Sequence, residues 1–125
     1  MTVALIAAGG ALGSLLRYGL GAALVALLGS SFPYGTLAAN VLGSFGLGVI
    51  AEALDGRAFL GADLRLVLGT GLMGGFTTYS SFNLETLRLA QAGELGRALV
   101  YVVATMILCL LVGLAGIALA RALRG

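Results

Sequence analysis

The stretch that decides the fold reads GTGLMGGFTTYSSF and runs from Gly69 to Phe82. It lies inside a longer apolar segment, yet it brings glycines, hydroxyl side chains and aromatic rings close together. A helix that faces only lipid does not need such residues. At membrane depth, the backbone can leave the helical conformation only where protein or a water-filled cavity satisfies its polar groups. The stretch therefore predicts a break in a membrane helix, at a permeation or binding site.

The composition is that of an integral membrane protein. Of the 125 residues, 60% are hydrophobic and only 10% are charged. A hydrocarbon core of roughly 30 Å requires about 20 helical residues. We therefore expect one all-α, multi-pass domain over residues 1–125, in the plasma or inner membrane of the cell and without a soluble domain. Its four transmembrane helices are expected at about residues 2–29, 35–54, 66–90 and 97–120.

Several functional classes are disfavoured by what the chain contains. The single cysteine, Cys109, excludes an intramolecular disulfide, and its apolar surroundings favour a buried thiol. Without histidine, the chain lacks the commonest metal ligand and general base. A net charge of +2 without a basic cluster does not indicate nucleic-acid binding. No nucleophile and base pair is visible, so we do not expect an enzyme.

The arginines near the helix ends give little preference for one orientation in the membrane. An excess of Lys and Arg in short loops sets orientation, but four arginines against two is a weak excess. Two hypotheses stay open: a single orientation with both termini inside, or a dual topology in which the chain pairs antiparallel with itself. The side that holds the two termini carries Arg57, Arg65, Arg121 and Arg124. The opposite side carries Arg88 and Arg97.

Four helices provide little interior in which polar residues can be kept away from lipid, which favours a homodimer. Small residues four positions apart allow two helices to approach closely. Gly113 and Gly116, like Gly43 and Gly46, can equally serve contacts inside one subunit. The candidate interface pairs are Gly9 with Gly13, Ser44 with Gly48, and Gly71 with Gly75.

The first apolar stretch contains one charge, Arg17. An unpaired arginine at the bilayer centre costs at least ~2.5 to 3.5 kcal/mol on insertion scales, so its side chain must reach the interface, find a partner or face water. Two interpretations stay open for Arg17, a helix-end anchor and a charge at a pore mouth. In either role, the positive charge of Arg17 makes the local electrostatic potential more favourable for anions.

The second stretch carries a polar stripe, because Thr36, Asn40 and Ser44 recur at steps of four on one helical face. Asn40 is the strongest member, since its amide has two donors that its own helix cannot satisfy. It either joins two helices or lines a polar path. A second edge follows in the fourth stretch, from Tyr101 through Thr105 to Cys109, although Tyr101 also suits the membrane interface.

The third stretch is expected to break at residues 74–78. Gly74 and Gly75 each lower helix propensity by roughly 1 kcal/mol. The neighbouring hydroxyls offer the backbone alternative hydrogen bonds. Opening the helix frees carbonyls such as those of Gly74 and Thr77, which are hard ligands suited to Na⁺. The alternative is a kinked but continuous helix.

The polar groups of these stretches favour an anion as the permeating species. Hydroxyls and a carboxamide donate hydrogen bonds, and an aromatic ring presents a positive edge. Proton-coupled carriers usually have an ionisable Asp, Glu or His at depth, and only Glu85 comes near to that. Glu85 could also cap a helix or line a vestibule.

Three segments, in order along the chain, resemble motifs of one family. GGALGSLLRYG from Gly9, GTLAANVLGSFGLG from Gly35 and GGFTTYSSFNLET from Gly74 are similar to those of the Fluc (CrcB) family of small bacterial fluoride channels. The resemblance implies an antiparallel dual-topology homodimer with two fluoride pathways, which let cytoplasmic fluoride leave down its gradient and so protect against fluoride toxicity. It also implies a structural Na⁺ at the dimer interface, held by the carbonyls of Gly74 and Thr77.

The resemblance further assigns residues to the fluoride pathway. Tyr79 stands where the family usually has the first of two phenylalanines, so conduction or selectivity is expected to differ here. A narrow path lined by hydrogen-bond donors and ring edges would replace the hydration shell of fluoride and exclude chloride by size. The implied pathway residues are Asn40, Tyr79, Phe82, Ser81, Thr36, Tyr101 and Thr105.

Two other functions compete with the channel. A small multidrug transporter also has four helices, but its mechanism needs a glutamate in the first helix, and residues 1–29 contain no acidic residue. An assembly subunit that conducts nothing stays open on the sequence.

Overall fold

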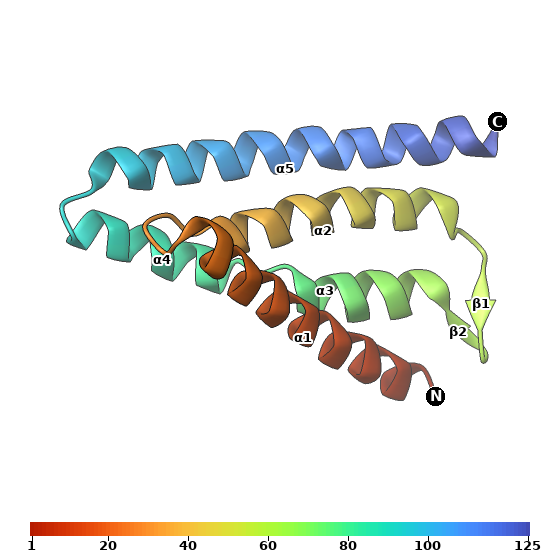
Figure 1. Ribbon diagram of the computed structural model, residues 1–125. Coiled ribbons are helices and arrows are strands. Elements are labelled where there is room, and N and C mark those ends of the chain that lie inside the picture. Colours follow the sequence, from red (N-terminus) through yellow and green to blue (C-terminus); the bar gives the residue numbers. More distant parts are fainter.

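The computed structural model describes residues 1–125 and is built mainly from helices. The third apolar stretch is divided into consecutive pieces, and a short antiparallel hairpin precedes it (Figure 1). The elements in chain order are α1 (Thr2–Leu28), α2 (Tyr34–Ala53), β1 (Ala58–Phe59), β2 (Ala62–Asp63), the π-helix η1 (Arg65–Met73), α3 (Gly74–Phe76), α4 (Ser80–Gln91) and α5 (Leu95–Arg124).

This architecture confirms the prediction of a helical membrane protein with a broken third helix. Three helices, α1, α2 and α5, are long and apolar enough to cross a membrane. The small hairpin was not predicted. It follows a turn at Gly56, and its own turn uses the positive φ of Leu60 and Gly61.

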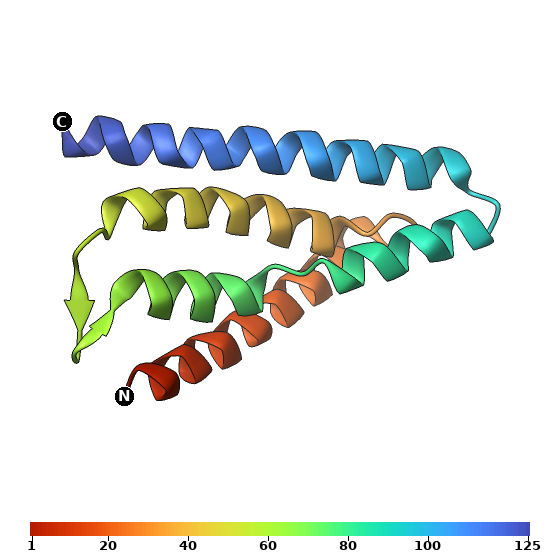
Figure 2. The same ribbon diagram turned by 180° about the vertical axis from the view of Figure 1, so that it is seen from behind.

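The helices are arranged around α2. α2 packs mainly against α5, while α1 crosses η1 and α3 obliquely (Figures 1 and 2). Both termini and the hairpin lie at one end of the molecule, and the loop between α4 and α5 lies at the other (Figure 1). Arg57 and Arg65 therefore share an end with Arg121 and Arg124, as a four-helix topology requires.

Close packing of α1 against the third segment depends on glycines from both sides. A Cβ atom on Gly9 would lie 2.9 Å from the Val67 carbonyl oxygen, and one on Gly71 would lie 2.9 Å from that of Ile6. Such distances are shorter than Cβ contacts allow, so a side chain would separate the two helices. A Cβ atom on Gly13 or on Gly75 would also come too close to the backbone of the opposite segment. The interface role expected for these pairs is therefore wrong, because they pack inside one chain.

The α2–α5 contact uses glycines in the same way. A Cβ atom on Gly48 would lie 2.5 Å from the Gly113 carbonyl oxygen, and one on Gly116 would collide with the Phe45 carbonyl. The Ser44–Gly48 pair therefore also serves packing within the chain. This contact places the polar stripe of α2 beside α5.

The break in the third segment lies at residues 77–79, slightly later than the predicted 74–78. Gly74 and Gly75 remain helical, because η1 continues into α3 while both pack beside α1. At Thr77 the backbone becomes extended, with φ −84° and ψ 159°. The Thr77 amide and hydroxyl both donate to the Met73 carbonyl, each at 2.9 Å, and so close the helix end. The alternative of a continuous kinked helix is wrong.

Candidate functional site

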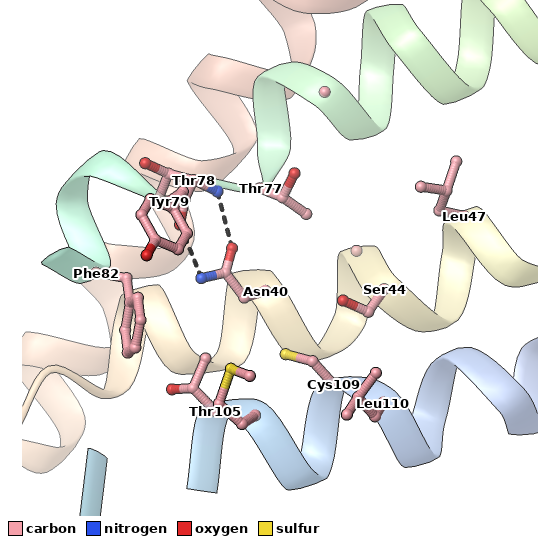
Figure 3. Close-up of a pocket in the computed structure, with 13 residues that line it drawn as sticks. Asn40, Ser44, Leu47, Thr77, Thr78, Tyr79, Phe82, Thr105, Cys109 and Leu110 are labelled. Carbon is pink, nitrogen blue, oxygen red and sulfur yellow. Dashed lines mark hydrogen bonds between the residues drawn. The ribbon is translucent and has the colours of Figure 1, made fainter. Parts of the chain in front are cut away.

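The helix break is held in place by Asn40 of α2. Its Nδ2 atom donates to the Thr78 carbonyl at 2.9 Å, and its Oδ1 atom accepts from the Thr78 amide at 2.8 Å (Figure 3). Asn40 is only 8% exposed, so these bonds satisfy a buried amide that its own helix could not. Two roles were predicted for Asn40, and the structure shows the first of them: Asn40 joins α2 to the third segment. One N–H of Nδ2 is left for another acceptor.

This arrangement removes the usual partners of two carbonyl groups. In a continuous helix, the Thr78 amide would bond to the carbonyl of Gly74, but here it bonds to Asn40. The Ser81 amide would likewise bond to the carbonyl of Thr77, but it donates to the Thr78 hydroxyl at 3.2 Å. The break thus frees the Gly74 and Thr77 carbonyls, as the glycine and hydroxyl pattern predicted.

A pocket of about 510 Å³ opens beside the break, between α2, the third segment and α5 (Figure 3). It brings together six of the residues that the sequence proposed for ion contacts. The polar groups come from three segments that are distant in the sequence. Those six residues are Asn40, Gly74, Thr77, Tyr79, Phe82 and Thr105.

Aromatic rings form a wall at one side of this pocket. The Phe82 ring lies edge-on to Tyr101, with centroids 5.0 Å apart, and to Tyr79, with centroids 5.9 Å apart. Phe82 is 8% exposed, whereas Tyr79 is 78% exposed. Tyr101 is fully buried and also meets the Phe32 ring, so its ring packs inside the protein.

Two buried hydroxyls near the pocket have no hydrogen-bond partner within the chain. They are Tyr101 Oη and Thr105 Oγ1, which lie one turn apart on α5. Buried polar groups in proteins are nearly always paired with protein, water or an ion. The Thr105 hydroxyl thus has hydrogen-bonding capacity that no neighbouring group of the chain uses.

A second pocket, of about 350 Å³, lies at the end of the molecule formed by the α1–α2 and α4–α5 loops. Glu85, Arg88 and Arg97 are among its lining residues. Thr36 donates to Glu85 Oε1 at 2.7 Å, so the polar stripe of α2 reaches this pocket through a carboxylate. The prediction that Glu85 lines a vestibule is consistent with this place.

Arg17 and Ser81 line neither of these pockets. The Nε atom of Arg17 donates to the Gly75 carbonyl at 3.3 Å, just before the break. The guanidinium thus lies at the carboxyl end of the interrupted helix, where its charge is favourable. Ser81 contributes its amide to the Thr78 hydroxyl.

Sequence reasoning missed two features of the site, the Thr78 backbone and Met106, whereas Cys109 was already placed on the polar edge of α5. Thr78 was noted only for its hydroxyl, yet its backbone is what Asn40 holds. Met106 and Cys109 line the first pocket beside Thr105. The step of four from Thr105 to Cys109 was a signal for the cysteine, but no pattern in the sequence singled out Met106 or the Thr78 backbone.

Comparison with known proteins assigns the chain to a family. Residues 4–117 match the family model described as "CrcB-like protein, Camphor Resistance (CrcB)". The chain belongs to this family. The resemblance that the three motifs carry is thereby confirmed.

Named relatives within the CrcB-like family match nearly the full length. A protein of Sorangium cellulosum is 50% identical over 118 residues, which is 94% of this chain and 93% of the relative. One of Thermus thermophilus is 50% identical over 122 residues, covering 97% of this chain and 94% of the relative. One of Agrobacterium fabrum is 42% identical over 121 residues, covering 97% of each. Each of the three is named "Fluoride-specific ion channel FluC".

Proposed function

We propose that this multi-pass membrane protein is a fluoride-selective channel of the plasma or inner membrane, through which cytoplasmic fluoride leaves down its electrochemical gradient. The observation that carries the proposal is the near full-length match to relatives named as fluoride-specific channels, at 42–50% identity. Neither a multidrug transporter nor a passive assembly subunit is favoured by these relatives. Lowering cytoplasmic fluoride would protect the cell from its toxicity.

The chemistry of the first pocket supports an anion. Its polar side chains include the free N–H of Asn40 and the unpartnered Thr105 hydroxyl. The pocket is also lined by Phe82 and Tyr79, and the partial positive charge at the edge of an aromatic ring attracts anions. A fluoride ion that gives up its hydration shell would exchange water hydrogen bonds for these positioned groups, as ions do in selectivity filters.

The pathway would extend from this pocket along α5 and α2. Tyr101 contributes a buried hydroxyl one turn from Thr105. Thr36 lies one turn from Asn40 and leads to the second pocket through Glu85. The roles of Ser81 in the pathway and of Arg17 at the pore mouth rest on the sequence, since neither lines the two pockets.

A homodimer with antiparallel, dual-topology subunits is part of the proposal. Tyr79 and Gly74 line the first pocket, and both are exposed at the surface of the single chain. These groups would otherwise face lipid, where unpaired polar groups are costly. A second copy on this face would cover them and give each pathway a complete wall.

The same interface suits a structural Na⁺. The freed carbonyls of Gly74 and Thr77 are hard oxygen ligands, which fit such an ion. Two oxygens are too few to hold it, and a two-fold-related copy would supply two more. The ion would supply a fixed positive charge that holds the two breaks together.

The proposal is tested by reconstituting the purified protein into liposomes and measuring efflux of fluoride and of chloride. We expect rapid fluoride efflux and little chloride efflux, because chloride is too large for a path of this kind. Equal loss of both anions, or loss of neither, would contradict the channel. Liposomes without protein provide the baseline.

A further inference from the structure

The hairpin between α2 and η1 carries two large apolar side chains that have no place in the proposed anion pathway. Phe59 of β1 is 51% exposed, and Leu60, in the turn that follows it, is 61% exposed. On the transmembrane helices, lipid explains such exposure, but the hairpin lies beyond the ends of α2 and η1. Neighbouring exposed apolar side chains outside the spans indicate an interaction surface.

The backbone of the turn shows that Leu60 does not serve the turn itself. Leu60 has a φ of 49° and Gly61 a φ of 80°, and two positive φ values in a two-residue hairpin turn are the feature of type I′. This turn prefers asparagine before glycine, because most side chains are strained in the left-handed region. A strained residue that the fold nevertheless holds points to a function for its side chain.

The hairpin is held in a fixed orientation along the membrane surface. Ala62, which pairs with Phe59, is buried, and β2 contacts α1. The hairpin lies across the ends of the helices, roughly perpendicular to α2 and α5, and its tip lies on the side away from α5, toward the N-terminal end of α1 (Figures 1 and 2). Because these helices cross the bilayer, a segment perpendicular to them runs along the bilayer surface. The tip therefore lies beside lipid.

The charges around the hairpin also suit a membrane surface. Asp55 and Asp63 both pair with Arg65, at 3.1 and 3.4 Å. Arg57, at the base of β1, is exposed and forms no ion pair within the chain. A free guanidinium can reach the phosphate groups of lipids. An apolar tip with a free cation at its base is typical of segments that bind at the bilayer interface.

We propose that the hairpin is a membrane-interface anchor, in which Phe59 and Leu60 enter the boundary between the lipid headgroups and the acyl chains. Arg57 lies at the level of the phosphates. Only Leu64 separates β2 from η1, so the anchor sets the depth at which the third segment begins. This role does not depend on which ion the protein conducts.

The chain contains no tryptophan, so Phe59→Trp introduces a single fluorophore at the tip. The full-length variant is reconstituted into phosphatidylcholine liposomes with and without lipids brominated on the acyl chains. We expect an emission maximum shifted to the blue of tryptophan in water, strong quenching by brominated lipid and weak quenching by aqueous iodide. Strong quenching by iodide with none by brominated lipid would place the tip in water and overturn the anchor. Shielding from both quenchers would show that protein, such as a second copy, covers the tip, and would overturn it too.

Leu60→Asn, added to Phe59→Trp, removes an apolar side chain while giving the turn its preferred residue. The emission should shift to the red, with less quenching by brominated lipid and more by iodide. Unchanged quenching would overturn the role of Leu60. Leu60→Trp in the otherwise unmodified chain repeats the measurement at the turn, and should give the same blue shift and quenching by brominated lipid.

Gln91→Trp is the matched control. Gln91 is an exposed polar residue at the end of α4, at the opposite end of the molecule, and it lines neither pocket. Its tryptophan should be quenched more by iodide and less by brominated lipid than the one at position 59. Equal quenching at both positions would show that any exposed tryptophan enters the interface, and would overturn the anchor. Circular dichroism should give the same helix content for all variants, because each substituted side chain is exposed.

Discussion

At the scale of single residues, Asn40 has a structural task that its polarity alone did not specify. Its carboxamide bonds to both the amide and the carbonyl of Thr78, which replaces the hydrogen bonds of an interrupted helix. The same side chain faces the pocket. Loss of function in an Asn40 variant therefore reports on the helix break as well as on the anion path, and stability must be measured beside flux.

Asn40→Asp is expected to suppress fluoride efflux and to lower stability. The carboxylate loses the Nδ2 donor and places negative charge 2.9 Å from the Thr78 carbonyl oxygen and beside the anion path. Leaving that buried carbonyl unpaired costs about 1–3 kcal/mol. Thermal unfolding in detergent and liposome efflux measure the two effects. Unchanged values of both would remove Asn40 from the break and from the path.

Thr105→Val separates a pathway role from a structural one. The variant keeps the side-chain shape but removes a hydroxyl that has no partner within the chain, so thermal stability should be unchanged or higher. Fluoride efflux should fall, because an anion loses a donor in the pocket.

Thr86→Val is the matched control for this substitution. The Thr86 hydroxyl donates to the Phe82 carbonyl at 2.7 Å, and Thr86 lines neither pocket. Loss of this hydrogen bond should lower the free energy of unfolding by about 0.5–1.5 kcal/mol. A Thr105→Val variant that is less stable but conducts fully would contradict the assignment of Thr105 to the pathway.

At the scale of elements, the third segment combines two departures from a regular α-helix. η1 is π-helical over nine residues, and the chain is extended at Thr77 before α4 begins. π-helical turns are rare and are frequently found at functional sites. Here the glycines of η1 and α3 fit against α1, so packing keeps residues 74–76 helical and moves the break to the hydroxyl-rich residues that follow.

Gly13→Ala should disrupt the contact between α1 and the third segment. The new methyl group would collide with the Leu72 carbonyl and lie 2.8 Å from the Phe76 amide nitrogen, and neither backbone atom can move away as a side chain does. We expect a lower unfolding temperature and a loss of fluoride efflux, since the break lies one residue beyond Phe76.

Gly19→Ala provides the matched control on the same helix. No atom lies within 4 Å of a Cβ built on Gly19, so the substitution should be neutral or stabilise α1 by up to about 1 kcal/mol. Equal destabilisation by both substitutions would show that close packing at Gly13 does not hold the third segment in place.

At the scale of the whole molecule, ion pairs connect the elements at the end that carries the termini. Glu52 of α2 pairs with Arg121 at 3.1 Å and accepts from Arg124, and Arg65 pairs with Asp55 at 3.1 Å. In the hairpin, hydrogen bonds from the Arg65 amide and side chain lower the pKa of Asp63. Four of the arginines that produce the weak orientation bias thus lie together at this end. Three of the four are paired with acidic side chains, so the excess of positive charge at this end is small. A small excess is compatible with the proposed dual topology.

Composition and motifs were sufficient to predict the class of protein, the approximate helices and the family. Apolar stretches of transmembrane length and three ordered motifs are local properties of the chain, and membrane helices form from local hydrogen bonds. Asn40, Phe82 and Thr105 were predicted as members of one site, and the pocket brings them together. The short hairpin and the π-helical geometry have no clear local pattern.

The sequence by itself determined that a membrane helix breaks beside Asn40 and that glycines allow close packing. Only the tertiary structure decided where the break begins, which helices the glycines bring together, and that Asn40 bonds to the Thr78 backbone. The physical reason is that helix propensity and polarity act within a few residues, whereas these outcomes depend on backbone atoms of segments that meet only after folding.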